Sequence, residues 1–247
     1  MWIRAELKKR AWTGLKEYYW MAFLISLVMY ITQGSITWTK DSNPMMDHYP
    51  MLYPHVIIPI VGLAVIIGIL IYLFLRCPIE VGGRKFFIRS AEKADNQKCF
   101  KFAYDRNNLK GIILTLLLRD VQNVLWFLLL IVPGIIKAYA YRMVPYILAD
   151  NPNIGCKKAI ALSIKMTNGQ KWKIFVLDLS FVGWFLLGLL AVGIGVIFVL
   201  PYYNATCAEL YLVLRKNALE NNFCTYDDLL LDNPDQLEPP DNPEYII

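Results

Sequence analysis

The sequence predicts an all-α fold, a polytopic transmembrane helical bundle of about six spans in three parallel hairpins, with amphipathic helices at the cytoplasmic interface. Three observations lead to this fold class. Apolar residues make up 57% of the 247 residues and mean hydropathy is +0.40, while only 18% of residues are charged, against about 25% in a typical soluble domain. Six stretches approach the roughly 20 apolar residues that cross a bilayer as a helix. Basic residues are concentrated in alternate connecting segments.

The predicted spans follow one another along residues 18–216. They cover residues 18–37, 54–76, 109–132, 135–149, 172–191 and 195–214. Trp20 and Trp38 bracket the first span, as expected of aromatic residues at the two membrane interfaces. We expect this span to be retained rather than cleaved as a signal peptide, because no A-x-A site follows it and a long basic arm precedes it.

Proline and glycine residues mark the expected turns and interruptions of these spans. One pair predicts a tight turn between the third and fourth spans, and a glycine-rich triplet predicts the turn between the fifth and sixth. Two prolines within the fourth and sixth spans indicate either a plain kink or an interrupted helix of the kind that transporters use. The candidate helix breaks are Pro133, Gly134, Pro145, Gly193, Gly195 and Pro201.

The distribution of charge predicts the orientation. Five basic residues lie in residues 1–17, nine in residues 76–110 and five in residues 157–173, whereas the opposite side carries only Lys40 and, just inside the fourth span, Lys137. The positive-inside rule therefore places both termini in the cytoplasm. After Lys216 the chain has eight acidic residues and no basic one, so residues 217–247 are predicted to be a disordered acidic tail.

The second and third hairpins resemble copies of one unit. Asp120 precedes Trp126 by six positions, Asp178 precedes Trp184 by the same interval, and Phe-Leu-Leu follows each tryptophan. A glycine-containing turn and a Pro-Tyr pair follow in both. Chance matching is the alternative, because leucine and phenylalanine recur throughout apolar segments.

Two basic segments are predicted to be amphipathic helices. Residues 1–17 place Ile3, Leu7, Ala11 and Leu15 on one stripe, and residues 155–167 show a similar pattern. Such helices lie in the headgroup plane of an anionic leaflet, or they pack on their own bundle, and the pattern leaves both alternatives open. The candidate contacts to anionic lipid are Lys8, Lys9, Arg10, Lys157 and Lys158.

Ionisable residues at bilayer depth are costly unless they are paired. The candidate intramembrane polar centre consists of Arg119, Asp120, Arg142, Asp178 and Glu209. From the helical rise we expect Arg142 to reach Asp120 or Glu209, and Arg119 to face a different side from Asp120. Such pairs either hold helices together or form a proton- or ion-coupled pathway. A third alternative is that single charges, Lys137 and Asp178 above all, reach the membrane interface by snorkelling.

Other functional classes find little support. The sequence contains no catalytic triad pattern, phosphate-binding loop or dinucleotide-binding motif, so we expect no catalytic residues, no cofactor and no enzymatic activity. Its five cysteines and two histidines have no metal-ligand spacing, which predicts no metal site. The basic balance comes without a nucleic-acid-binding signature, so no nucleic-acid partner is expected.

Long strings of residues resemble one bacterial family. These strings are Trp126-Phe-Leu-Leu, the run from Val132 to Pro152, and Leu177-Asp-Leu-Ser-Phe-Val-Gly-Trp. They resemble an integral-membrane family, mostly from Gram-positive bacteria, catalogued as domain of unknown function 975. The resemblance covers nearly residues 1–215 and implies a multi-pass plasma-membrane protein, without an activity that could be transferred. It is also distantly similar to the membrane domain of some glycerophosphodiester phosphodiesterases, whose catalytic barrel this chain lacks.

Two functional hypotheses remain. The first is a non-enzymatic membrane protein that handles or senses lipids or amphipathic peptides at the cytoplasmic leaflet, with anionic membrane lipids and a cytoplasmic protein as expected partners. The second is a small transporter or exporter built on Asp120 and Arg142. The sequence leaves the oligomeric state open.

Overall fold

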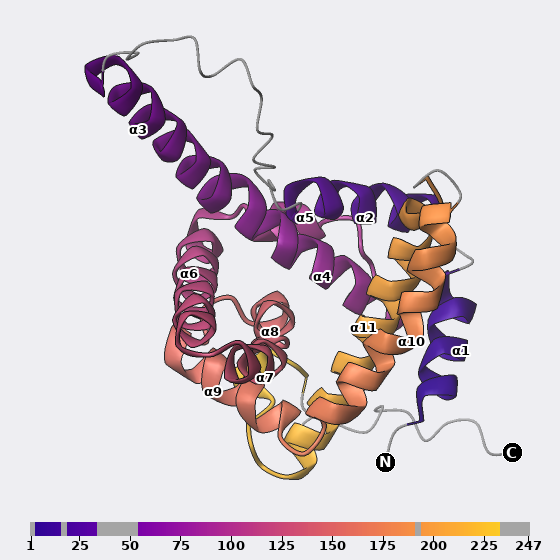
Figure 1. Ribbon diagram of the computed structural model, residues 1–247. Helices are drawn as coiled ribbons and strands as arrows, with labels where there is room; N and C mark the ends of the chain where they lie inside the picture. Colours follow the sequence, from indigo (N-terminus) through magenta and orange to yellow (C-terminus); the bar gives the residue numbers. More distant parts are fainter. Residues whose placement is uncertain (1–2, 16–18, 34–53, 191–193, 233–247) are drawn as a thin grey trace, which may run out of the picture.

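The computed structural model describes residues 3–15, 19–33, 54–190 and 194–232. Within these ranges the secondary structure is helical, without strands (Figure 1). The elements are α1 (Arg4–Leu15), α2 (Tyr19–Gln33), α3 (Pro54–Ile71), the π-helical turn η2 (Tyr72–Arg76), α4 (Cys77–Ala91), α5 (Cys99–Ala103), α6 (Arg106–Leu129), α7 (Ile131–Tyr141), α8 (Val144–Asp150), α9 (Cys156–Thr167), α10 (Lys171–Leu190), α11 (Ile194–Glu220) and the 3₁₀ turn η3 (Asp227–Leu229).

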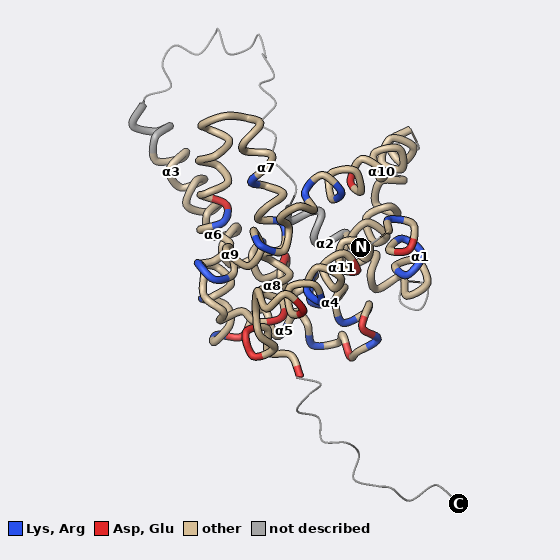
Figure 2. The backbone as a smooth tube through the Cα atoms, turned by 90° about the horizontal axis from the view of Figure 1, so that it is seen from below, with Lys and Arg blue, Asp and Glu red and all other residues tan. Residues whose placement is uncertain are grey.

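Four helical segments in the described part of the chain are long and apolar enough to cross a membrane. They are Pro59–Ala91, Arg106–Leu129, Lys171–Leu190 and Gly195–Glu220. Figure 2 shows that charged residues gather in one half of the molecule, whereas the described outer part of α3 and the tips of the α6–α7 pair and of α10 are almost free of charge. The structure is therefore consistent with a multi-pass membrane protein.

The apolar tips have side chains that the protein itself leaves uncovered. Ile60 is 62% exposed, Leu128 83% and Leu190 82%, and α3 extends away from the other helices (Figure 1). Exposed apolar area of this extent marks a surface that another apolar phase covers. Lipid is the phase that matches the length and composition of these helices.

The buried core lies around α4, which packs against α2, α5, α8 and α11. Val81, Phe86 and Phe87 of α4 are at most 1% exposed. Gly82 permits the approach of α5, because a Cβ atom there would lie 2.9 Å from Cδ1 of Phe100. This close packing fixes the polar side chains of α4 against the neighbouring helices.

The predicted second span is the beginning of a longer helix. It was expected to end at residue 76, but the helix continues through η2 into α4 and ends at Ala91. Pro78 lies in the first turn of α4 and cannot donate a backbone hydrogen bond to the preceding turn. The π-helical turn directly before it absorbs this irregularity without ending the helix.

The turn between the third and fourth predicted spans is at Leu130 rather than at Pro133 and Gly134. Leu130 is extended, with φ −159° and ψ 141°. Pro133 lies in the first turn of α7. Backbone N–H groups of the first turn have no acceptor within the helix, so a proline there removes no hydrogen bond. Gly134 allows α7 to approach α6, because a Cβ atom there would lie 2.6 Å from Cδ1 of Phe127.

The predicted span over residues 135–149 is divided into two short helices. α7 has 11 residues and α8 has 7, with Arg142 and Met143 in the turn between them. Pro145 lies in the first turn of α8, as expected for a helix break. Pro201, in contrast, lies inside α11 and does not end it.

The remaining predicted breaks lie at the connection between α10 and α11. Gly193 is outside the described residues, whereas Gly195 belongs to the first turn of α11. A Cβ atom on Gly195 would lie 2.7 Å from Cα of Gly188. The two glycines therefore permit the close crossing of α10 and α11.

The first part of the predicted disordered tail is ordered. α11 extends to Glu220, and the segment that follows packs on the core, with Cys224 7% and Leu229 0% exposed. The side chain of Asn151 donates to the carbonyl of Asp228 at 3.0 Å. The prediction of disorder is wrong for residues 217–232, because apolar anchors stand among the acidic residues, and residues 233–247 lie outside the described ranges.

Leu229→Ala is expected to lower the free energy of unfolding by about 2 kcal/mol, because it removes a buried side chain and leaves a cavity. Leu230→Ala is the matched control, since the neighbouring side chain is 67% exposed and its truncation is expected to cost less than about 0.5 kcal/mol. Chemical unfolding of both variants in detergent checks the difference. Equal stability of the two variants would contradict the packing of this segment.

Candidate functional site

Asp178 of α10 accepts hydrogen bonds from two helices and a turn. Arg142 approaches its two carboxylate oxygens through Nη1 and Nη2 at 2.5 and 2.8 Å. The hydroxyls of Tyr139 and Tyr203 donate to it at 3.0 and 3.2 Å. Arg142 also donates to Tyr203 at 2.8 Å and to Sγ of Cys207 at 3.2 Å. This network joins α7, α10 and α11 at the turn before α8.

Arg119 and Asp120 of α6 form a second network with the long helix that contains α4. Arg119 donates through Nη1 to Glu80 at 3.1 Å and through Nε to Asp120 at 2.7 Å. The hydroxyl of Tyr72 donates to the other carboxylate oxygen of Asp120 at 2.5 Å. The side chains of Arg119 and Glu80 are 12% and 10% exposed, so this ion pair is largely withdrawn from solvent.

The residues of the predicted polar centre thus belong to two separate networks, and their partners differ from the expected ones. Arg142 pairs with Asp178 rather than with Asp120 or Glu209, and Arg119 turns back to its neighbour Asp120. Glu80, which pairs with Arg119, was not among the residues predicted for this centre. The signal for Glu80 was present, since residues 76, 80 and 84 place charges one helical turn apart on one face.

In both networks the aspartate is bound by a tyrosine that stands six residues before a proline. Tyr72 stands six residues before Pro78, and Tyr139 stands six residues before Pro145. Each tyrosine donates to the aspartate of the next long helix, Tyr72 to Asp120 and Tyr139 to Asp178. Asp120 and Asp178, which correspond in the second and third hairpins, therefore also accept the same kind of contact from the hairpin before each of them.

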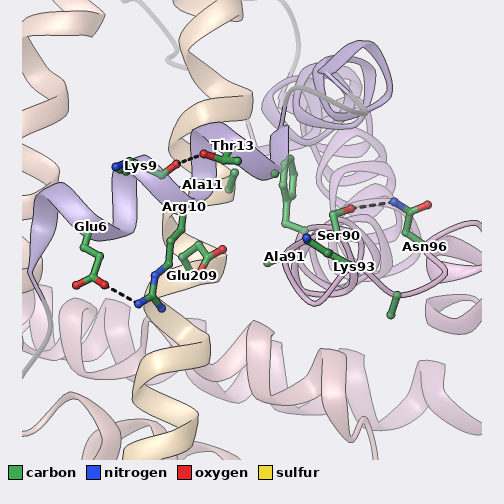
Figure 3. Close-up of a pocket in the computed structure, with 14 residues that line it drawn as sticks. Glu6, Lys9, Arg10, Ala11, Thr13, Ser90, Ala91, Lys93, Asn96 and Glu209 are labelled. Atoms are coloured by element: carbon green, nitrogen blue, oxygen red, sulfur yellow. Dashed lines mark hydrogen bonds and ion pairs between the residues drawn. The ribbon is translucent and has the colours of Figure 1, made fainter.

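Glu209 lies apart from both networks, beside a groove between α1 and the end of α4. This groove has a volume of about 750 Å³. Its charged lining residues are Glu6, Lys9, Arg10, Lys93 and Glu209. Figure 3 shows Arg10 between Glu6 and Glu209, with the ion pair to Glu6 at 2.7 Å. Phe87, Ala11 and Ala205 supply an apolar part of the wall.

The apolar stripe of α1 packs on the protein itself. Leu7, Ala11 and Leu15 are 2%, 4% and 0% exposed, and α1 packs mainly against α11. Of the two alternatives for this helix, packing on its own bundle is therefore the one observed. The polar face remains on the surface, where Lys9 and Arg10 are exposed.

The candidate lipid contacts differ in their surroundings. Lys8 is partly buried, with Nζ 4.3 Å from the ring centroid of Phe181, and burial, together with the nearby Arg4, lowers its pKa. Lys157 and Lys158 of α9 are exposed, and Lys158 pairs with Asp228 at 2.5 Å. Ala159 and Ile160 of the same helix are buried, so α9 also packs on the bundle. Lys9 and Arg10 are the candidates that border a groove.

No cluster of three or more histidine, cysteine, aspartate or glutamate side chains suited to a metal ion occurs in the ranges that the structure describes. The arrangement offers ion pairs, hydrogen bonds and a cationic groove. These elements can hold helices together and bind anions.

Comparison with known proteins identifies part of the chain. Residues 121–218 match the family described as "Protein of unknown function (DUF975)". This match extends from α6 to α11, and over these residues it confirms the resemblance found in the sequence. No curated protein and no solved structure matches the chain significantly.

Proposed function

We propose that this chain, whose residues 121–218 match a family of unknown function, is a non-enzymatic protein of the bacterial plasma membrane that binds anionic lipid at the cytoplasmic leaflet. Both termini lie on the cytoplasmic side in this proposal. The observation that carries it is the groove of about 750 Å³ beside α1, which joins exposed cationic side chains to an apolar wall. Small-molecule sites in proteins typically have volumes of about 300–1,000 Å³.

Two basic segments far apart in the sequence contribute to this groove. α1 brings Lys9 and Arg10, and the segment after α4 brings Lys93. Both segments belong to the regions that the positive-inside rule assigns to the cytoplasm. Near an anionic leaflet each lysine or arginine contributes about 1 kcal/mol of attraction. A lipid headgroup at this position meets the three cations Lys9, Arg10 and Lys93, beside the carboxylates of Glu6 and Glu209.

Lys9→Gln combined with Arg10→Gln is expected to weaken the binding of short-chain phosphatidylglycerol about tenfold or more, because two cationic contacts of about 1 kcal/mol each are removed. Calorimetric titration of the detergent-solubilised full chain at low salt measures this change. Short-chain phosphatidylcholine, which carries no net charge, is expected to bind weakly to wild type and variant alike.

Lys98→Gln combined with Lys101→Gln is the charge-matched control. Both lysines are exposed, and neither lines the groove. This variant is expected to retain at least half of the wild-type affinity. An equal loss of affinity in the two double variants would contradict specific binding in the groove, because the affinity would then depend only on the total charge of the protein.

The hydrogen bonds of Asp120 and Arg142 support the alternative function, transport through a centre at these two residues, less well than lipid binding. Asp120 accepts from Arg119 and Tyr72, and Arg142 is held by Asp178 and Tyr203. Groups that are satisfied in this way suit a role in holding helices together.

A further inference from the structure

The long helix that contains α4 brings a row of alternating charges into the core. Arg76, Glu80 and Arg84 stand one turn apart on this helix. Arg119 and Arg142 lie near the same row, together with the carboxylates that they bind, Asp120 and Asp178. Four guanidinium groups therefore meet three carboxylates, which leaves one positive charge without a counterpart among the described residues.

Arg76 and Arg84 are the two arginines of this cluster that have no ion pair among the described residues, and Arg84 is the one that lines a cavity between the helices. Arg119 pairs with Glu80 and Asp120, and Arg142 pairs with Asp178. Arg84 donates through Nη1 to the neutral amide oxygen of Asn204 at 2.9 Å, and its guanidinium lies 5.0 Å from the ring centroid of Tyr146. Its Nε is buried without a hydrogen-bond partner. A charge that is largely withdrawn from solvent and has no ion pair of its own is costly.

Arg84 faces a cavity that three arginines share. The cavity has a volume of about 190 Å³, and Arg84, Arg119 and Arg142 line it together with Glu80, Tyr146 and Tyr203. Since one water occupies about 30 Å³ of liquid, this space has room for a small polyatomic anion. It lies among α4, α6, α8 and α11, and none of its lining residues lines the groove beside α1.

We propose that this cavity binds a phosphate group, with Arg84 as its principal ligand. The planar guanidinium presents donors that match phosphate oxygens in pairs. A phosphodiester or monobasic phosphate carries one negative charge, which equals the excess in the cluster. Glu80 on the cavity wall disfavours more highly charged anions. The phosphate comes either from a lipid headgroup or from free phosphate, and this site does not depend on the groove beside α1.

Two probes distinguish these sources in titrations of the full-length chain in detergent. Inorganic phosphate near pH 6 tests free phosphate, and short-chain phosphatidylglycerol tests the lipid headgroup. The readouts are the dissociation constant and the rise in the midpoint of thermal unfolding. The variant Lys9→Gln with Arg10→Gln is used for the lipid titration, so that binding in the groove does not mask binding in the cavity.

Arg84→Gln is expected to weaken the binding of at least one of the two probes tenfold or more. Arg89→Gln is the matched control, since Arg89 is an exposed arginine on the same helix, and it is expected to change the affinity less than twofold. Binding of phosphatidylglycerol alone identifies a lipid site, whereas binding of inorganic phosphate identifies a site for the free anion.

Asn204→Asp keeps the test decisive if Arg84→Gln fails to fold. The new carboxylate lies where Arg84 already donates to the side-chain oxygen, so it supplies the missing negative charge from within the protein. This variant is expected to unfold at a higher temperature without ligand and to lose the stabilisation by phosphate. The proposal is overturned if neither probe stabilises the protein, or if Arg84→Gln or Asn204→Asp binds the probes as wild type does.

Discussion

Asp178→Asn is expected to lower the free energy of unfolding by about 3 kcal/mol, the lower end of the usual cost of removing one partner from a buried ion pair, because the side chains of Arg142 and Asp178 are 16% and 24% exposed. The carboxylate is the common acceptor of Arg142, Tyr139 and Tyr203. Without it, Arg142 keeps its charge in the core and has only neutral acceptors. Unfolding of the purified protein in detergent, followed by circular dichroism, measures the loss.

Asp228→Asn is the matched control for this prediction. It breaks the ion pair with Lys158, whose side chain is 56% exposed, and it is expected to cost about 1 kcal/mol or less. A double variant with Arg142→Met and Asp178→Leu removes both charges of this partly buried pair and is expected to recover much of the loss. An effect of Asp178→Asn as small as that of Asp228→Asn would show that the network does not hold these helices together.

Gly188→Val is expected to destabilise the protein by about 3 kcal/mol, at the upper end of the usual cost of overpacking. A Cβ atom on Gly188 would lie 2.6 Å from the backbone nitrogen of Val196 and 2.7 Å from the carbonyl carbon of Gly195. Because both contacts are with backbone atoms, a side-chain rotation cannot relieve them. α10 and α11 must then separate at their crossing.

Gly183→Val on the same helix provides the comparison. A Cβ atom there meets nothing within 4 Å, and the expected change in stability is within about 0.5 kcal/mol. The midpoints of thermal unfolding of both variants in one detergent test the contrast. If Gly188→Val is as stable as Gly183→Val, the close crossing of α10 and α11 is wrong.

Hydropathy alone predicted the long helices, because length and apolar composition are properties of a single segment. It therefore located α6, α10 and α11 and the outer part of the α3–α4 helix. It did not locate the turn at Leu130, which depends on the approach of Gly134 to Phe127 from the neighbouring helix. Proline and glycine at residues 133 and 134 indicated a break nearby without fixing its position.

Four charged residues of the core, Arg119, Asp120, Arg142 and Asp178, were predicted, but their pairing was not, and Glu80 and Arg84 were missed. A helical rise gives depth in the membrane, whereas partners depend on how each helix is rotated about its axis. The pairing of Arg142 with Asp178 instead of Asp120 depends on such rotations, which the sequence does not show. Composition also concealed the packing of Cys224 and Leu229, which are buried anchors among acidic residues.

Amphipathic patterning predicted the apolar stripe of α1 but not the surface that covers it. Leu7 and Leu15 are suited to a membrane interface and to a neighbouring helix alike, and in the structure they pack against α11 and the core. The same packing brings Lys9 and Arg10 beside Lys93. The groove is therefore a product of tertiary structure, and the sequence showed only its charges.

Native mass spectrometry of the protein released gently from its own membrane tests the binding of anionic lipid most directly. We expect a stoichiometric anionic lipid on the wild-type protein, and one lipid fewer on the variant Lys9→Gln with Arg10→Gln than on Lys98→Gln with Lys101→Gln. A bare wild-type protein, or lipid bound only in statistical amounts and equally by both variants, would contradict the account.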